Sequence, residues 1–282
     1  MPLHDLSYQR FEGGRTEQLA RSLAIARMTT SLLLKRRSFL LLLCACWIPV
    51  IARAAQIYVA RYVPQASEFV TVTARLWQEF LTQQVEYLPV LLVALYAGAG
   101  AISTDLSSGA FVAYLSKPIS RFDYFLGKAI PVFLAILVVT LVPALALFGV
   151  YLSVANDFGV LETAPLLPLS VIAYSLWIGL YFTVFVLAIS CLSRSGRVAG
   201  AGFVALALGS GIVLSGMMAA LRLPSPPASL SMIGATIDSA HVFFGNVSSG
   251  DTPYLSIVAM TSLMLLSAFV LRRRLGSAEV AS

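Results

Sequence analysis

Residues 129–156 read AIPVFLAILVVTLVPALALFGVYLSVAN, a run of 28 residues without a charged side chain. A helix in the core of a soluble domain seldom needs more than about 14 uninterrupted apolar residues, whereas a bilayer crossing needs roughly 20. The rest of the chain is similar, because 59% of its 282 residues are hydrophobic and only 11% are charged. An average soluble domain carries about a quarter charged residues. The composition therefore predicts an integral membrane protein.

Five other uncharged or nearly uncharged runs bring the number of predicted transmembrane helices to six. None of these runs alternates apolar and polar residues as barrel strands do, which favours an all-α membrane protein. The predicted spans are Ser38–Tyr58, Tyr87–Thr104, Ala129–Asn156, Thr163–Ser193, Val198–Leu221 and Thr252–Leu271. The third and fourth runs exceed one crossing, which predicts tilt or turns outside the membrane. Pro165 and Pro168 predict that the fourth helix starts near Leu169.

The positions of the basic residues predict the orientation of the helices. Most lie before the first span or in the connections after the second, fourth and sixth: Arg10, Arg15, Arg21, Arg27, Lys35, Arg36, Arg37, Lys117, Arg121, Lys128, Arg194, Arg197, Arg272, Arg273 and Arg274. The opposite side carries Arg53, Arg61, Arg75 and Arg222. The positive-inside rule places both termini in the cytoplasm, as an even number of spans also requires. We therefore expect a cytoplasmic segment 1–37, a six-helix transmembrane domain 38–271 and a cytoplasmic tail 272–282.

The N-terminal segment contains an amphipathic pattern. Thr16–Leu34 mixes charged and apolar residues at helical spacing, and Leu19, Leu23 and Ala26 can share one stripe. A basic amphipathic helix that leads into a span is typical of one lying in the cytoplasmic membrane interface. A plain positive anchor for the first span explains the same charges, and both interpretations remain open.

On the predicted outer side, residues 222–251 contain three prolines and apolar stretches that are too short to cross the bilayer. They predict re-entrant or interfacial helices, with His241 at the interface. The connection 59–86 is long enough for one short helix. Arg53 lies about 24 Å above Arg37 along the first helix, so we expect its side chain to snorkel to the outer interface.

Several kinds of chemistry have no sequence signal. The chain lacks the phosphate-loop motif G-x-x-x-x-G-K-[ST] and the hydrolase motifs H-E-x-x-H and G-x-S-x-G, so we predict no catalytic residues. Cys44, Cys46 and Cys191 lie within spans and read as small apolar residues, and no metal site is predicted. Apart from Arg53, the spans carry no ionisable residue, which disfavours an ion-coupled transporter. The basic charge is a topology signal and does not indicate nucleic-acid binding.

The segment 105–128 is an ordered insert between the second and third spans. Asp105 follows two residues that can cap a helix, and Phe111, Tyr114 and Leu115 form one apolar stripe. Pro118 ends that helix. Ser120 precedes Asp123 by three residues, the spacing of a capping box that starts the next helix. The pattern predicts a helix, a sharp turn at Pro118 and a second helix at the membrane surface. The open interpretations are an ordinary loop and a docking element for a cytosolic partner.

The same segment resembles a known signature. TDLSSG at residues 104–109, LSKPISR at 115–121 and LGK at 126–128 are similar to the pattern of permease subunits of type-2 ATP-binding-cassette (ABC) exporters. That family shows an acidic residue, a Gly, L-S-x-P-[IV]-S-R and [LF]-G-K after its second span, and usually has Glu where this chain has Asp105. The resemblance extends to the N-terminal helix, the six spans and the broken helices between spans five and six.

The resemblance implies a function. The chain would be a permease of the bacterial cytoplasmic (inner) membrane that pairs as a homodimer or heterodimer, is surrounded by membrane lipids and binds two copies of a separate ABC ATPase. ATP and Mg would be bound by that ATPase and no cofactor by this chain. ATP-driven movement would pass through the N-terminal helix and the segment after span two. The residues expected to couple the two subunits are Asp105, Gly109, Lys117, Pro118, Ser120, Arg121, Gly127 and Lys128.

Two other functions remain open at this point. An ABC-type complex could anchor a larger machine or transmit force to it without moving a solute, whereas an ion-coupled secondary transporter fits less well. The substrate is not indicated by the sequence. Five aromatic residues could line an apolar path, although aromatic side chains near membrane interfaces are often anchors. They are Tyr96, Tyr151, Tyr174, Trp177 and Tyr181.

Overall fold

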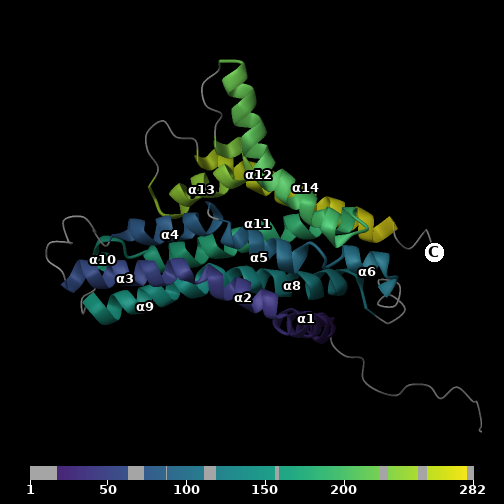
Figure 1. The fold of residues 1–282 in the computed structure, drawn as a ribbon, viewed down its shortest axis with the longest axis horizontal. Helices are drawn as coiled ribbons and strands as arrows, with labels where there is room; N and C mark the ends of the chain where they lie inside the picture. Colours follow the sequence, from purple (N-terminus) through teal and green to yellow (C-terminus); the bar gives the residue numbers. More distant parts are fainter. Residues whose placement is uncertain are drawn as a thin grey trace, which may run out of the picture.

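The computed structural model describes residues 18–62, 73–86, 88–110, 119–155, 159–222, 228–246 and 253–277. All regular elements in these ranges are helices (Figure 1). They are α1 Gln18–Leu34, α2 Arg37–Cys46, α3 Ile48–Tyr62, α4 Ala74–Glu86, α5 Pro89–Gly98, α6 Ser103–Ser107, α8 Arg121–Val139, α9 Leu141–Ala155, α10 Gly159–Thr163, α11 Leu167–Leu192, α12 Gly196–Ala220, the 3₁₀ turn η2 Ala228–Leu230, α13 Met232–Phe243 and α14 Pro253–Ser277. The predicted all-α class is confirmed.

Six stretches in the described part of the chain are long and apolar enough to cross a membrane, and each overlaps one predicted span. They are Arg37–Tyr62, Pro89–Ser107, Arg121–Val154, Leu167–Leu192, Gly196–Ala220 and Pro253–Arg274. The fourth helix begins at Leu167, two residues before the predicted start. Pro168 fits in its first turn because a backbone N–H has no helical partner there in any case.

The third span is longer than one crossing and is divided into α8 and α9. Thr140 separates the two helices, and its hydroxyl donates to the carbonyl of Ile136. The second span is also divided, because residues 99–102 between α5 and α6 form turns instead of helix. These breaks set the directions of the helices that form the candidate site.

Helix α4 supplies two partners for the side chain of Arg53. Arg53 of α3 does not turn away from the protein: its guanidinium donates to Gln83 Oε1 of α4 at 2.8 Å and lies 3.7 Å from Glu79 Oε2. Its side chain is 15% exposed. Arg53 therefore joins α3 to α4 by an ion pair and a hydrogen bond, because α4 brings a carboxylate and an amide within reach, and its position relative to the membrane interface stays a prediction.

The segment between spans five and six folds onto the bundle. At 12 residues, α13 is too short to cross a bilayer. The carbonyl of Thr236 accepts a hydrogen bond from Tyr174 of α11 at 2.8 Å, and Ser256 of α14 donates to Asp238 at 2.6 Å. His241 Nδ1 lies 3.3 Å from Gln78 Nε2 of α4. The predicted short helices of this region are therefore present, and α13 packs against α4, α11, α12 and α14.

Helix α12 leaves the bundle along its length. Near Ser210 it contacts the start of α13, where the backbone N–H of Met232 donates to the Ser210 hydroxyl at 3.1 Å. Beyond this point α12 rises out of the body of the molecule (Figure 1). Four apolar side chains in this outer half are more than half exposed: Ile212, Val213, Met217 and Leu221. The fifth span therefore presents an uncovered apolar surface.

Candidate functional site

The candidate site lies at the end of the bundle where α1, α6 and the start of α8 meet (Figure 1). We call it the basic end, because Lys35, Arg36, Arg37, Arg194, Arg197, Arg272, Arg273 and Arg274 lie at the helix ends on this side. Two sets of contacts hold α8 there, one to α6 and one to α1. A third set holds α6 to α11.

Asp105 of α6 is held by two residues of α8. Its Oδ2 atom lies 2.7 Å from Lys128 Nζ and accepts a hydrogen bond from the Tyr124 hydroxyl at 2.8 Å. Tyr124 and Lys128 are one helical turn apart and so share a face of α8, and the ammonium lies 5.7 Å from the tyrosine ring centre. The side chains of Asp105 and Lys128 are 16% and 9% exposed. A buried ion pair with an added hydrogen bond thus joins spans two and three.

The start of α8 is capped as the sequence predicts. The Ser120 hydroxyl accepts from the Asp123 backbone N–H at 3.1 Å, and Asp123 Oδ2 accepts from the Ser120 backbone N–H at 3.0 Å. The second carboxylate oxygen of Asp123 accepts from the Ser22 hydroxyl of α1 at 3.3 Å. The capping box therefore ends the loop, starts α8 and connects α8 to the N-terminal helix.

Gly127 permits the close contact between α1 and α8. A Cβ atom at this position would lie 2.6 Å from Ile25 Cβ and 3.2 Å from the carbonyl oxygen of Ser22. Real Cβ atoms essentially never approach another heavy atom below 3.0 Å. Asp123 and Gly127 are one turn apart, so the face of α8 that meets α1 adjoins the face that meets Asp105.

The break between α5 and α6 is held by Ser190 of α11. Its hydroxyl accepts from the backbone N–H groups of Ile102 and Ser103 at 3.1 and 3.0 Å and donates to the carbonyl of Ala99 at 2.8 Å. Ser103 donates to the same carbonyl at 2.9 Å. One buried side chain thereby satisfies three backbone groups that the interrupted helix leaves without helical partners. This bonding fixes the direction in which α6 leaves the bundle.

The other predicted coupling residues have different positions. Gly109 follows α6 with φ +72°, a conformation that favours glycine, but a Cβ there would meet nothing within 4 Å. Gly109 is therefore suited to a turn, whereas the close approach is made by Gly127. Arg121 is half-buried at the first position of α8. Lys117 and Pro118 lie outside the described residues, as does the apolar stripe of Phe111, Tyr114 and Leu115.

Of the five aromatic residues predicted for a substrate path, Tyr174 and Trp177 both pack against Phe243. Tyr151, Tyr174 and Tyr181 are buried, and the Tyr151 hydroxyl accepts from the backbone N–H of Val160. Trp177 is half-buried against Phe243. The Tyr96 hydroxyl forms a hydrogen bond with Ser38, and Tyr96 lines a groove between α5 and α12.

Some residues of the site were not predicted. Tyr124, Ser22 and Ser190 were missed, and Asp123 was predicted only as a cap. Tyr124 could have been noted from its four-residue spacing to Lys128. Ser22 and Ser190 are single serines in apolar helices, and their partners lie about a hundred and about ninety residues away.

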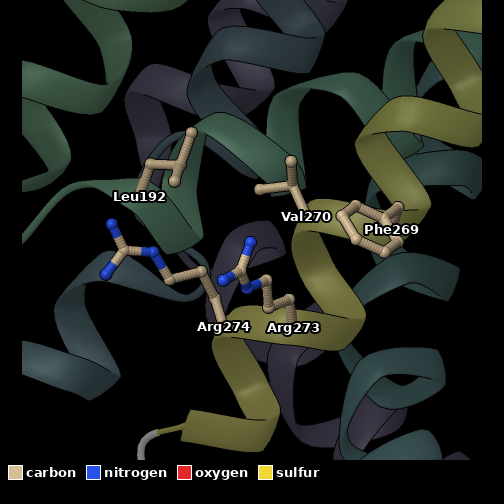
Figure 2. Close-up of a pocket in the computed structure, with 5 residues that line it drawn as sticks. All are labelled: Leu192, Phe269, Val270, Arg273 and Arg274. Carbon is tan, nitrogen blue, oxygen red and sulfur yellow. The ribbon is translucent and has the colours of Figure 1, made fainter.

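The described residues hold no group of three or more His, Cys, Asp or Glu side chains that could bind a metal. A second feature of the basic end is a hollow of about 470 Å³ where α14 meets the end of α11. Figure 2 shows Arg274 reaching from α14 toward Leu192 of α11, with Arg273, Val270 and Phe269 beside it. What the basic end offers is therefore charged and polar contacts between rigid helices.

Comparison with known proteins agrees with this description. A search of curated proteins found no match. A family model described as ABC-2 family transporter protein matches residues 23–272, which include all six spans and the contacts of Asp105, Asp123 and Gly127. We conclude that the chain is a multi-pass membrane protein of the ABC-2 transporter family, whose members are the permease components of ABC transporters.

Proposed function

We propose that the chain is the permease of an ABC exporter driven by a separate ATPase subunit, and that α1, α6 and the start of α8 receive the movement of that subunit. The observation that carries the proposal is the set of contacts around α8. A push on α1 or α6 reaches the third span through Gly127 on one face of α8 and through the Asp105–Lys128 pair on the adjoining face. A flexible connection between these helices and the third span would transmit little of the movement.

The ATPase would be present in two copies, because the permease would act as a pair. The exposed outer half of α12 supports this part of the proposal. Its Ile212 side chain is 71% exposed, and no other part of the described chain covers this face. The direction of transport is proposed from the resemblance to exporters, and the cargo is left open.

The test uses the complex of the permease with the ABC ATPase encoded beside it, reconstituted in liposomes. Gly127→Ala places a methyl group 2.6 Å from Ile25 Cβ and so forces α1 away from α8. The matched control is Gly149→Ala in α9, where a Cβ would meet nothing within 4 Å. We expect Gly127→Ala to lower permease-dependent ATP hydrolysis at least fivefold while the control stays at the parent rate.

Two results would contradict the proposal. One is the absence of a stable complex between the permease and the ATPase. The other is a Gly127→Ala complex that forms normally and hydrolyses ATP at the rate of the control. Vesicles that hydrolyse ATP but move no lipid, peptide or drug would remove export and leave force transmission as the function.

A further inference from the structure

A groove of about 630 Å³ lies between α1 and α8 on the side away from the Asp105 contacts. One face of α1 forms its first wall, with residues three and four positions apart: Leu23, Ala26, Arg27, Thr30, Ser31, Leu34 and Lys35. Ile130 and Leu134, one turn apart on α8, form the second wall.

The two walls have different chemistry. Arg27 and Lys35 are exposed, eight residues apart and so separated by about 12 Å along the helix direction. In the described part of the chain neither side chain has an ion-pair or hydrogen-bond partner. The hydroxyl groups of Thr30 and Ser31 lie between them on the same face. This wall presents two cations and two hydrogen-bonding groups, which suits a phosphate group.

The second wall belongs to a transmembrane span. Ile130 and Leu134 follow the charged first turns of α8 in the stretch Arg121–Val154. Leu134 is 48% exposed, and Leu23 and Leu34 are exposed to a similar extent. Side chains of this kind at membrane depth require an apolar neighbour. The groove therefore joins a cationic end to an apolar surface that continues into the bilayer.

We propose that the α1–α8 groove binds an anionic phospholipid of the surrounding bilayer. Its phosphate would lie between Arg27 and Lys35, and its acyl chains would follow Ile130 and Leu134 along α8. Basic pockets between transmembrane helices bind anionic head groups in this way. The bound lipid would fill the space beside the α1–α8 contact and hold α1 at the membrane surface. This inference does not depend on the ATPase coupling proposed above.

Two other hollows at the basic end combine cations with apolar walls, but they support the binding of an anionic lipid less strongly. The groove that contains Arg36 and Arg197 is lined by α12, whose uncovered face adjoins it. Arg274 in the hollow of Figure 2 already interacts with another residue. The α1–α8 groove differs from both in that the hydroxyl groups of Thr30 and Ser31 lie beside its two cations.

The test is lipid titration of the full-length purified permease by native mass spectrometry. Phosphatidylglycerol and phosphatidylcholine with the same acyl chains are compared, and inorganic phosphate is added as a competitor. We expect phosphatidylglycerol to bind at least tenfold more tightly than phosphatidylcholine, with no displacement by inorganic phosphate. A cation near a membrane surface is worth about a fivefold change in affinity, so Arg27→Gln and Lys35→Gln should each weaken binding about fivefold and together about 25-fold.

The matched control is the double variant Arg194→Gln and Arg272→Gln, which removes two exposed cations from the same end without touching the groove. A further variant, Leu134→Trp, fills the apolar wall without a charge change and should also weaken phosphatidylglycerol binding. The inference is overturned if the groove and control doubles bind equally, or if inorganic phosphate displaces the lipid. It is also overturned if assembly with the ATPase expels the lipid, because the groove would then be a protein-docking surface.

Discussion

The ion pair between Asp105 and Lys128 allows a quantitative prediction. Lys128→Met leaves the Asp105 carboxylate 16% exposed with the hydrogen bond from the Tyr124 hydroxyl in place. Asp105→Asn leaves the Lys128 ammonium 9% exposed without its carboxylate. Removing one member of a buried pair costs about 3 kcal/mol, because the other charge remains desolvated. We therefore expect each single variant to lose about 3 kcal/mol of unfolding free energy, or roughly 6–12 °C in Tm for a chain of this size.

The double variant distinguishes a buried pair from two independent side chains. With both charges removed, no desolvated charge remains, so the double variant should lose about 2 kcal/mol in place of the sum of about 6 kcal/mol. The assay is unfolding of the detergent-purified permease in mixed micelles with increasing dodecyl sulfate, followed by circular dichroism. The reasoning would be refuted if the free-energy losses of the two single variants added up to that of the double variant. It would also be refuted if each single variant lost less than about 1 kcal/mol, because the pair would then behave as a solvent-exposed one.

Three further predictions concern the other contacts and use the same unfolding assay. Ser190→Ala should cost about 2–4 kcal/mol because two buried N–H groups lose their acceptor, whereas Ser215→Ala on the exposed part of α12 should change little; equal effects would exclude a special role for Ser190. Ser120→Ala should cost about 1 kcal/mol by removing the cap on the Asp123 N–H, and a neutral result would show that the capping box is dispensable. Arg53→Met should destabilise the protein by about 1–2 kcal/mol through the loss of its bonds to α4, and a variant as stable as the parent would show that these bonds do not stabilise the fold.

Much of the fold could be predicted because its signals are local. The six spans follow from apolar runs, and the start of α8 follows from Ser120 and Asp123, which are three residues apart. The candidate site was predicted in part, since Asp105, Gly127 and Lys128 were named without their roles. Those roles depend on contacts between distant segments. Nothing near Gly127 in the sequence shows that Ile25 lies against it, and nothing near Arg53 shows that α4 folds back beside α3.

The contact between α1 and α8 also has a consequence for how the protein is made. Ser22 and Asp123 are 101 residues apart, so α1 leaves the ribosome long before its binding partner exists. At about 5–20 residues per second this delay lasts about 5–20 s. During that interval Ile25 and Leu33, which end up buried, have no protein surface to cover them. The nascent α1 must therefore be sheltered by lipid or a chaperone until span three is inserted.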